Sequence, residues 1–162
     1  MRPFAFVLSV GLFAFASAPT RAEDAAAWAA LQRPGVVALM RHALAPGTGD
    51  PADLTLGDCT TQRNLDDRGR AQARRIGAAL RARGIVFDRV LTSEWCRCRE
   101  TARLLDLGAP EALPALNSFF GRFALRDART AAARAFLAEQ PPEARLLMVT
   151  HQVNISALTG RG

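Results

Sequence analysis

The stretch VVALMRH, residues 36–42, determines how the rest of this sequence is interpreted. Its five apolar residues follow Pro34-Gly35 and end at the cationic pair Arg41-His42. A short apolar run that opens with β-branched residues is typical of a buried strand in a parallel sheet. Ligands of open α/β sheets bind at the carboxyl ends of the strands, so we expect Arg41 and His42 to lie where a ligand binds.

The second of the chain's two histidines repeats this arrangement. RLLMVT, residues 145–150, is another apolar run, and it ends in His151. A third run, residues 86–92, leads to Ser93, which we expect to cap a helix that carries Arg97 near its electropositive N-terminus. Arginine forks match phosphoryl oxygens, and a neutral histidine can accept a phosphoryl group, so these strand ends predict a phosphate pocket.

Segments with strand and helix patterns alternate along the chain, which predicts an α/β fold with a parallel sheet. The expected strands are residues 36–42, 86–92, 110–116 and 145–150, and the expected helices are residues 25–33, 66–83, 93–107, 126–139 and 153–158. Asp66 can cap the first long helix. Residues 43–63 are rich in Gly, Pro, Asp and Thr, and they form a long loop of the kind that is often functional.

Length and charge limit the classes of partner. The 162 residues suggest one domain with a sizeable core. The net charge of +6 comes from arginine alone, because the sequence contains no lysine, and it favours anionic partners. The basic residues are scattered, tyrosine is absent and no nucleic-acid-binding motif is present, so we expect no nucleic-acid partner. No pattern in the sequence specifies an oligomeric state.

The N-terminal 22 residues have the pattern of a signal peptide. Arg2 precedes an apolar run over residues 4–16, and small-residue cleavage sites follow, of which we favour the one after Ala22. The alternative is a membrane anchor, but the run is too short to span a bilayer comfortably. We therefore expect a mature domain over residues 23–162, periplasmic or secreted, with no stable membrane span after cleavage.

Export would place the three cysteines in an oxidising compartment. Cys96 and Cys98 are too close in sequence to pair without strain, so we expect Cys59 to form a disulfide with one of them and leave one free thiol. The alternative is a metal site built from the three thiols, although their spacing fits no usual zinc pattern.

Four motifs, in order along the chain, resemble those of the histidine phosphatase (phosphoglycerate mutase-like) superfamily. They are Leu39-Met40-Arg41-His42, Asn64-Leu65 with Gly69-Arg70-Ala71-Gln72-Ala73, Ser93 to Ala102, and Val149-Thr150-His151. WCRC at 95–98, TQRNL at 61–65 and LNSFF at 116–120 are similar to an exported branch with phosphatases proposed to act on lipopolysaccharide-core heptose phosphate. The resemblance implies a three-layer α/β sandwich with a mostly parallel central sheet. Relatives usually continue into one more strand after the segment that corresponds to residue 162, so the sheet of this chain can lack the last edge strand.

The resemblance also implies roles for individual residues. His42 would be the phosphorylated nucleophile, Arg41 and Arg97 would bind the phosphoryl oxygens, and His151 would donate a hydrogen bond to the same group. Ser93 would orient the loop. Asn64 and Gln152 are further candidates for substrate binding. The family chemistry implied by this resemblance needs neither a metal nor a cofactor.

The acid that protonates the leaving group is not evident. Many relatives carry Glu where this chain has Asn117, and another branch carries Asp where this chain has Gln152. Glu94 and Asp58 are the nearest candidates.

We therefore expect an exported, metal-independent phosphatase that hydrolyses a phosphomonoester through a phosphohistidine intermediate on His42. Its substrate would be a small phosphorylated compound or an envelope phosphosugar. The alternative is a non-catalytic or weakly catalytic phospho-ligand-binding protein of the same fold, which the missing acid favours. A metal-binding protein built on the two histidines is a further alternative, and it lacks an obvious third ligand.

Overall fold

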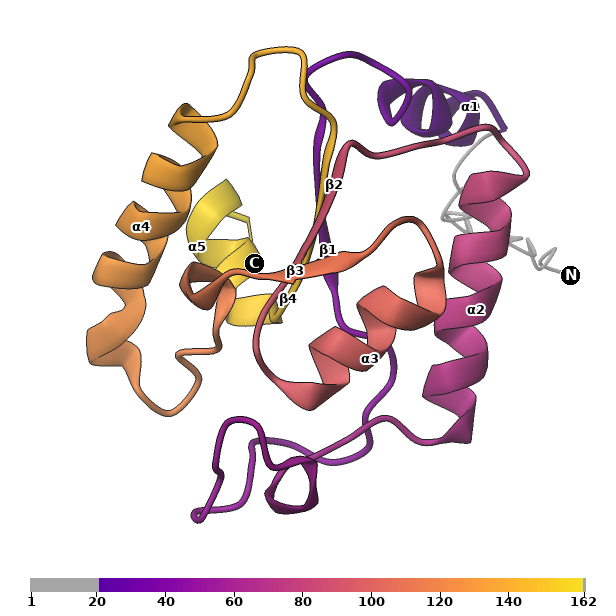
Figure 1. Cartoon of the computed structure of the whole chain (residues 1–162). Coiled ribbons are helices and arrows are strands. Elements are labelled where there is room, and N and C mark those ends of the chain that lie inside the picture. Colours follow the sequence, from indigo (N-terminus) through magenta and orange to yellow (C-terminus); the bar gives the residue numbers. More distant parts are fainter. Residues whose placement is uncertain (1–20, 162) are drawn as a thin grey trace, which may run out of the picture.

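A parallel sheet of four strands forms the central layer of the computed structural model, which describes residues 21–161. The strands are β1 (Val37–Arg41), β2 (Arg89–Thr92), β3 (Pro110–Ala112) and β4 (Leu146–Thr150), in the order β1-β4-β2-β3. Helices α2 (Asp67–Arg81) and α3 (Cys96–Leu105) cover one face, and α4 (Arg126–Ala138) and α5 (Gln152–Thr159) cover the other (Figure 1). The predicted three-layer α/β fold is confirmed.

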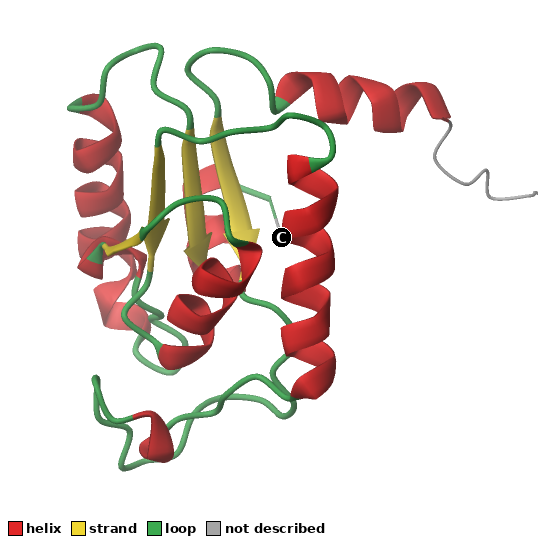
Figure 2. Cartoon of the chain, turned by 45° about the vertical axis from the view of Figure 1, so that its right-hand side comes forward, coloured by secondary structure: helices red, strands yellow, loops and turns green. Residues whose placement is uncertain are grey.

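Strand β4 lies in the middle of the sheet, and all five of its residues are buried. It pairs with β1 and β2 so that Arg41 lies opposite Thr150 and Thr92 lies opposite Val149. The pairing continues one residue further, because the backbone N–H of His42 donates to Thr150 O at 3.0 Å. The three strands therefore end together, and the residues that follow them share one edge of the sheet (Figure 2).

Two expected elements are shorter in the structure. The segment predicted as a strand over residues 110–116 pairs only over Pro110–Ala112 and then forms a 3₁₀ turn, Pro114–Leu116, because a proline at the first position favours a helical turn. The expected strand over residues 86–92 begins at Arg89. Two further 3₁₀ turns, Cys59–Thr61 and Phe123–Leu125, lie in the loops.

The prediction that Ser93 caps a helix is wrong. Helix α3 begins at Cys96, and Trp95 occupies the capping position in an extended conformation, with no side-chain hydrogen bond that caps the helix. The Ser93 hydroxyl is engaged elsewhere, because it lies 3.0 Å from Nε2 of His151 and 3.2 Å from Oδ1 of Asn117.

Helix α2 begins as predicted, since Oδ1 of Asp66 accepts from the backbone N–H of Gly69 at 2.7 Å. Gly69 and Gly77 let this helix approach its neighbours closely. A Cβ atom would lie 1.9 Å from Leu44 O at Gly69 and 1.9 Å from Leu105 O at Gly77. Any side chain at either position would therefore push α2 away from the backbone segment that it contacts.

Helix α1 (Arg21–Ala30) begins earlier than the helix expected over residues 25–33 and just before the predicted mature N-terminus at Glu23. The predicted signal peptide otherwise lies outside the described residues. No helix over residues 21–161 has the length and apolar character needed to cross a membrane.

The structure shows which cysteine pairs with Cys59. Cys59 and Cys96 form the disulfide, and Cys98 is a buried free thiol. The alternative of a three-thiol metal site is wrong, because two of its sulfurs are bonded to each other. Over residues 21–161 no group of three or more His, Cys, Asp or Glu side chains comes close enough to hold a metal ion.

Candidate active site

A cavity of about 240 Å³ opens at the carboxyl edge of the sheet. Residues at the strand ends line one side of it, and residues of the loop 43–66 line the other. This loop runs beyond the same edge of the sheet (Figures 1 and 2). Charged and aromatic side chains predominate among the residues that line it: Arg41, His42, Asp50, Arg63, Arg97, Phe120 and His151. The sequence-predicted pair of histidines is thus brought together.

His42 is buried with one ring nitrogen directed at the backbone and the other at the cavity. Its Nδ1 lies 2.7 Å from Ala43 O, and because a carbonyl oxygen only accepts, Nδ1 carries the hydrogen. Nε2 therefore carries the lone pair, which accepts a hydrogen bond from Nε of Arg97 at 3.2 Å. Burial, together with the charges of Arg97 and Arg41, lowers the pKa of His42 to about 4, although the Ala43 hydrogen bond acts in the opposite direction. At neutral pH the imidazole is an uncharged nucleophile.

Arg97 lies in the first turn of α3, and only 3% of its side chain is exposed. Its guanidinium faces both histidines, with Nη2 3.4 Å from Nδ1 of His151. The opposite edge forms a bidentate ion pair with Asp50, at 2.5 Å from Nη1 to Oδ1 and 2.9 Å from Nη2 to Oδ2. This buried cation is therefore paired, as burial of a charge requires.

His151 is also buried, and its ring packs edge-on against His42 and Trp95, with centroids 5.5 Å and 5.4 Å away. With Nδ1 accepting from Arg97, Nε2 carries the hydrogen and donates to Oγ of Ser93 at 3.0 Å. The Ser93 hydroxyl in turn donates to Oδ1 of Asn117. Burial and the positive charge of Arg97 lower the pKa of His151 to about 2, so this ring is neutral as well.

The other predicted residues divide between two places. Arg41 and Gln152 line the same cavity as His42, both on its exposed side. Asn64 and Glu94 instead line a separate, larger cavity of about 940 Å³ that contains neither histidine. Asp58 is exposed and caps a 3₁₀ turn by accepting from Thr60 N at 2.9 Å.

Three polar residues therefore lie outside the histidine cavity. Asn64 is held by its own loop, where Nδ2 donates to Cys59 O at 2.6 Å, and Glu94 accepts from Nδ2 of Asn117 at 2.7 Å. Neither candidate acid, Glu94 or Asp58, lines the cavity with His42. The structure places no proton donor from this pair beside the nucleophile.

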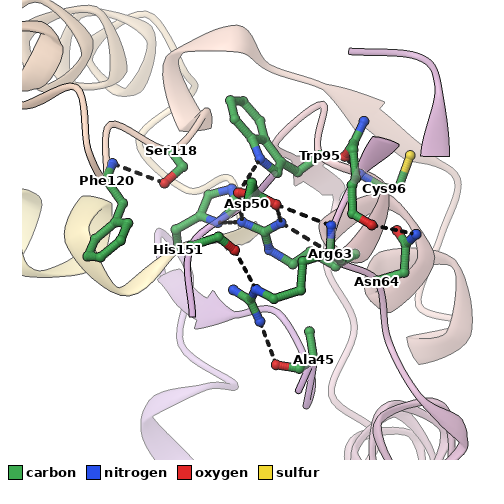
Figure 3. A network of polar contacts seen from close by, with 12 residues as sticks. Ala45, Asp50, Arg63, Asn64, Trp95, Cys96, Ser118, Phe120 and His151 are labelled. Carbon is green, nitrogen blue, oxygen red and sulfur yellow. Dashed lines mark hydrogen bonds and ion pairs between the residues drawn. The ribbon is translucent and has the colours of Figure 1, made fainter. Parts of the chain in front are cut away.

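Sequence reasoning missed Asp50 and Arg63. Arg63 holds the loop together by donating from Nε to Gly49 O at 2.7 Å and from Nη1 to Ala45 O at 2.5 Å (Figure 3). Burial raises the pKa of Asp50, but the hydrogen bonds and charge of Arg97 outweigh it and hold the pKa below its ordinary value. No periodic pattern marks a loop residue, so the only available signal was the unusual length of the loop.

Two buried histidines and a paired arginine thus meet at the ends of parallel strands, where arginine N–H donors can match a tetrahedral oxyanion. The sequence model of the histidine phosphatase superfamily (branch 1) matches residues 37–123. The chain belongs to this superfamily.

Individual proteins show the same likeness. The serine/threonine-protein phosphatase Pgam5, mitochondrial, of Drosophila virilis is 42% identical over 52 residues, which are 32% of this chain and 18% of that protein. A structure from Nakamurella multipartitia named as a phosphohistidine phosphatase SixA has 25% sequence identity and a TM-score of 0.54, covering 75% of this chain and 62% of that one. The chain thus spans less than two thirds of the length of either protein.

The fold recurs at lower identity. The alpha-ribazole phosphatase from Shigella flexneri has 21% sequence identity and a TM-score of 0.56, with 77% of this chain and 78% of that chain covered. At this identity the likeness concerns the fold alone.

Proposed function

We propose that this protein is a phosphatase that transfers the phosphoryl group of a phosphomonoester to His42 and then to water. The observation that carries the proposal is the unprotonated Nε2 of His42, which lines the cavity at the strand ends and accepts a hydrogen bond from Nε of Arg97 at 3.2 Å. A phosphoryl group placed there would meet a nucleophile and a fork of N–H donors together.

The reaction has two steps. In the first, Nε2 of His42 attacks phosphorus, the N–P bond forms, and the bond from phosphorus to the ester oxygen breaks. In the second, water attacks phosphorus, the N–P bond breaks and inorganic phosphate leaves. Arg97 and Arg41 bind the oxygens on which charge accumulates, and because these side chains supply the positive charge, the proposal gives no step to a metal or cofactor.

The departing ester oxygen must also gain a proton. Since neither Glu94 nor Asp58 lines the cavity, we propose that turnover favours leaving groups that are stable as anions. The same observation supports a second candidate function, a weakly catalytic phospho-ligand-binding protein of this fold.

We further propose that the substrate is small or presents its phosphate on an exposed arm, as an envelope phosphosugar would. The cavity of about 240 Å³ has room for a phosphoryl group and a small part of its ester, and its lining includes Phe120, which is 54% exposed. The Cys59–Cys96 disulfide supports a periplasmic or secreted location, because disulfides persist in oxidising compartments.

The test is turnover of p-nitrophenyl phosphate by residues 23–162, with trapping of an acid-labile phosphoenzyme, beside His42→Ala. We expect turnover, a trapped phosphohistidine, loss of both in the variant, and no effect of EDTA. A folded wild-type protein, checked by circular dichroism, that shows neither labelling nor turnover would contradict the proposal and favour the binding function. Activity lost on chelation and restored by a divalent cation would contradict the metal-independent step.

A further inference from the structure

We propose that Asp50 is a positioning residue that fixes which edge of the Arg97 guanidinium faces the substrate. The inference rests on the proposed phosphatase function and adds a residue to it. Asp50 touches neither histidine by hydrogen bond in the structure, and it acts through its ion pair with Arg97.

The argument begins with the shape of a guanidinium. It is planar and offers two forks of parallel N–H donors, an end fork from Nη1 and Nη2 and a side fork from Nε and Nη2. In this structure Asp50 takes the end fork, because Nη1 and Nη2 of Arg97 lie 2.5 Å and 2.9 Å from its two oxygens. The end fork is therefore closed to a phosphate.

The side fork faces the two imidazoles. Nε of Arg97 lies 3.2 Å from Nε2 of His42, and Nη2 lies 3.4 Å from Nδ1 of His151. A phosphoryl group attacked by His42 has to replace these two hydrogen bonds, so the side fork is the edge that becomes available to bind it next to the nucleophile. By occupying the end fork, Asp50 therefore leaves the side fork of Arg97 to face the substrate.

Asp50 is itself held in place from several sides. The indole N–H of Trp95 donates to Oδ2 at 3.1 Å, and the backbone N–H of Arg63 donates to Oδ1 at 3.3 Å (Figure 3). Only 17% of the Asp50 side chain is exposed. A carboxylate that accepts this many hydrogen bonds is fixed in position and stays ionised, which suits an anchor better than a proton donor.

Two other roles for Asp50 make different predictions. A carboxylate that competes with substrate for Arg97 would weaken phosphate binding, so its removal would tighten binding and leave or raise kcat. A general acid would matter most for esters with poor leaving groups. A positioning residue instead affects the transition state more than the bound ground state, because only the transition state requires alignment with His42.

The experiment compares Asp50→Asn with Asp53→Asn, which makes the same change at an exposed position of the same loop. For each variant we would measure kcat and KM on p-nitrophenyl phosphate, and Kd for inorganic phosphate and for vanadate, a transition-state mimic. In Asp50→Asn we expect kcat to fall about 10- to 100-fold and vanadate affinity to fall with it, while KM and phosphate affinity change less than about threefold. Asp53→Asn should match wild type.

Asp50→Glu provides the second variant in case Asp50→Asn does not fold. It keeps the charge but moves the carboxylate by one methylene, so we expect an intermediate loss of kcat and of vanadate affinity. Equal loss of phosphate and vanadate affinity, tighter binding of both, or wild-type kcat in either folded Asp50 variant would overturn the positioning role. If wild type itself has no turnover and forms no phosphoenzyme, the proposed function fails, whatever the Asp50 variants show.

Discussion

One wall of the cavity consists of strand ends and the first turn of a helix, whereas the facing wall is a loop. We call His42, His151 and Arg97 the strand wall, and Asp50 and Arg63 the loop wall. The strand wall carries the nucleophile and the donors, and regular backbone hydrogen bonds hold it in place. The loop wall carries no nucleophile, and side-chain contacts to the other wall fix it.

The difference between the two walls suggests a separate task for each of them in the proposed reaction. Under the proposed function, the strand wall supplies the reacting groups, and Asp50 of the loop wall directs them through its ion pair with Arg97. Loss of a reacting group should therefore cost more than loss of the loop's attachment, and the loop should matter through the geometry of the strand wall. Three predictions test this order.

The largest effect is expected for His151→Ala in the strand wall. This change removes the ring that accepts from Nη2 of Arg97 at 3.4 Å and packs against His42 with the centroids 5.5 Å apart, so the arginine and the nucleophile each lose a contact that positions them. We expect kcat to fall by about 10²-fold, the cost of misplacing reacting groups. Steady-state kinetics on p-nitrophenyl phosphate measures it.

Gln152→Ala is the matched control, because Gln152 follows His151 and is exposed. We expect a smaller change, confined to KM, if Gln152 binds only the exposed part of the substrate. A His151→Ala enzyme with more than a tenth of wild-type kcat would show that the second histidine is dispensable.

An intermediate effect is expected when the loop is detached by the Cys59→Ser/Cys96→Ser double substitution. The bond joins the loop to the residue next to Arg97 across 37 positions of sequence. Its loss should lower the free energy of unfolding by about 2–4 kcal/mol. It should also lower kcat by about tenfold, because Asp50 is then less firmly held. Chemical denaturation and steady-state kinetics measure the two quantities.

A reductant should produce the same changes in wild type and none in the double variant. If the double variant retained wild-type kcat despite its lower stability, the loop wall would have no part in directing Arg97.

The smallest effect is expected in the proton NMR titration of the two histidines. The pKa values of His42 and His151, about 4 and about 2, lie below the ordinary 6.5, so neither imidazole C2–H resonance should move between pH 8 and pH 5.5. His42→Gln assigns the two resonances. A midpoint near 6.5 for His42 would mean that the imidazole is solvated and that the strand wall is not closed as described.

The same shifts set the pH dependence of stability. The folded state binds protons less readily than the unfolded chain, whose histidines take up protons near pH 6.5. The contribution of these histidines to stability is therefore fully present above about pH 6.5, and it is lost progressively as the pH falls toward 4 for His42 and toward 2 for His151.

The sequence was sufficient to predict the strand wall. Apolar runs that end in His42 and His151 identify two strand ends, and parallel pairing brings such ends to one edge of the sheet. The helix cap at Asp66 was predictable for the same reason, since its hydrogen bond to Gly69 is local.

The sequence was insufficient to predict contacts in which a side chain bonds a partner far away along the chain. Ser93 has the local pattern of a cap, and its hydroxyl does accept from the backbone N–H of Trp95 at 3.3 Å, but it also bonds His151, 58 positions away. Asp50 pairs with Arg97 across 47 positions of a loop without periodicity. The choice between Cys96 and Cys98 depends on a helix turn that directs residues two apart to opposite sides, one toward the loop and one into the core.

The position of the Cys59–Cys96 disulfide also bears on when the enzyme becomes active. In the folded protein the bond fastens the loop to the first residue of α3, one position before Arg97. Under the proposed export, a precursor held in a reducing compartment would have an unfastened loop and a poorly directed Arg97. Such a precursor would do little damage to the phosphorylated metabolites around it, and the cell would be protected from its own phosphatase until the chain reached its destination.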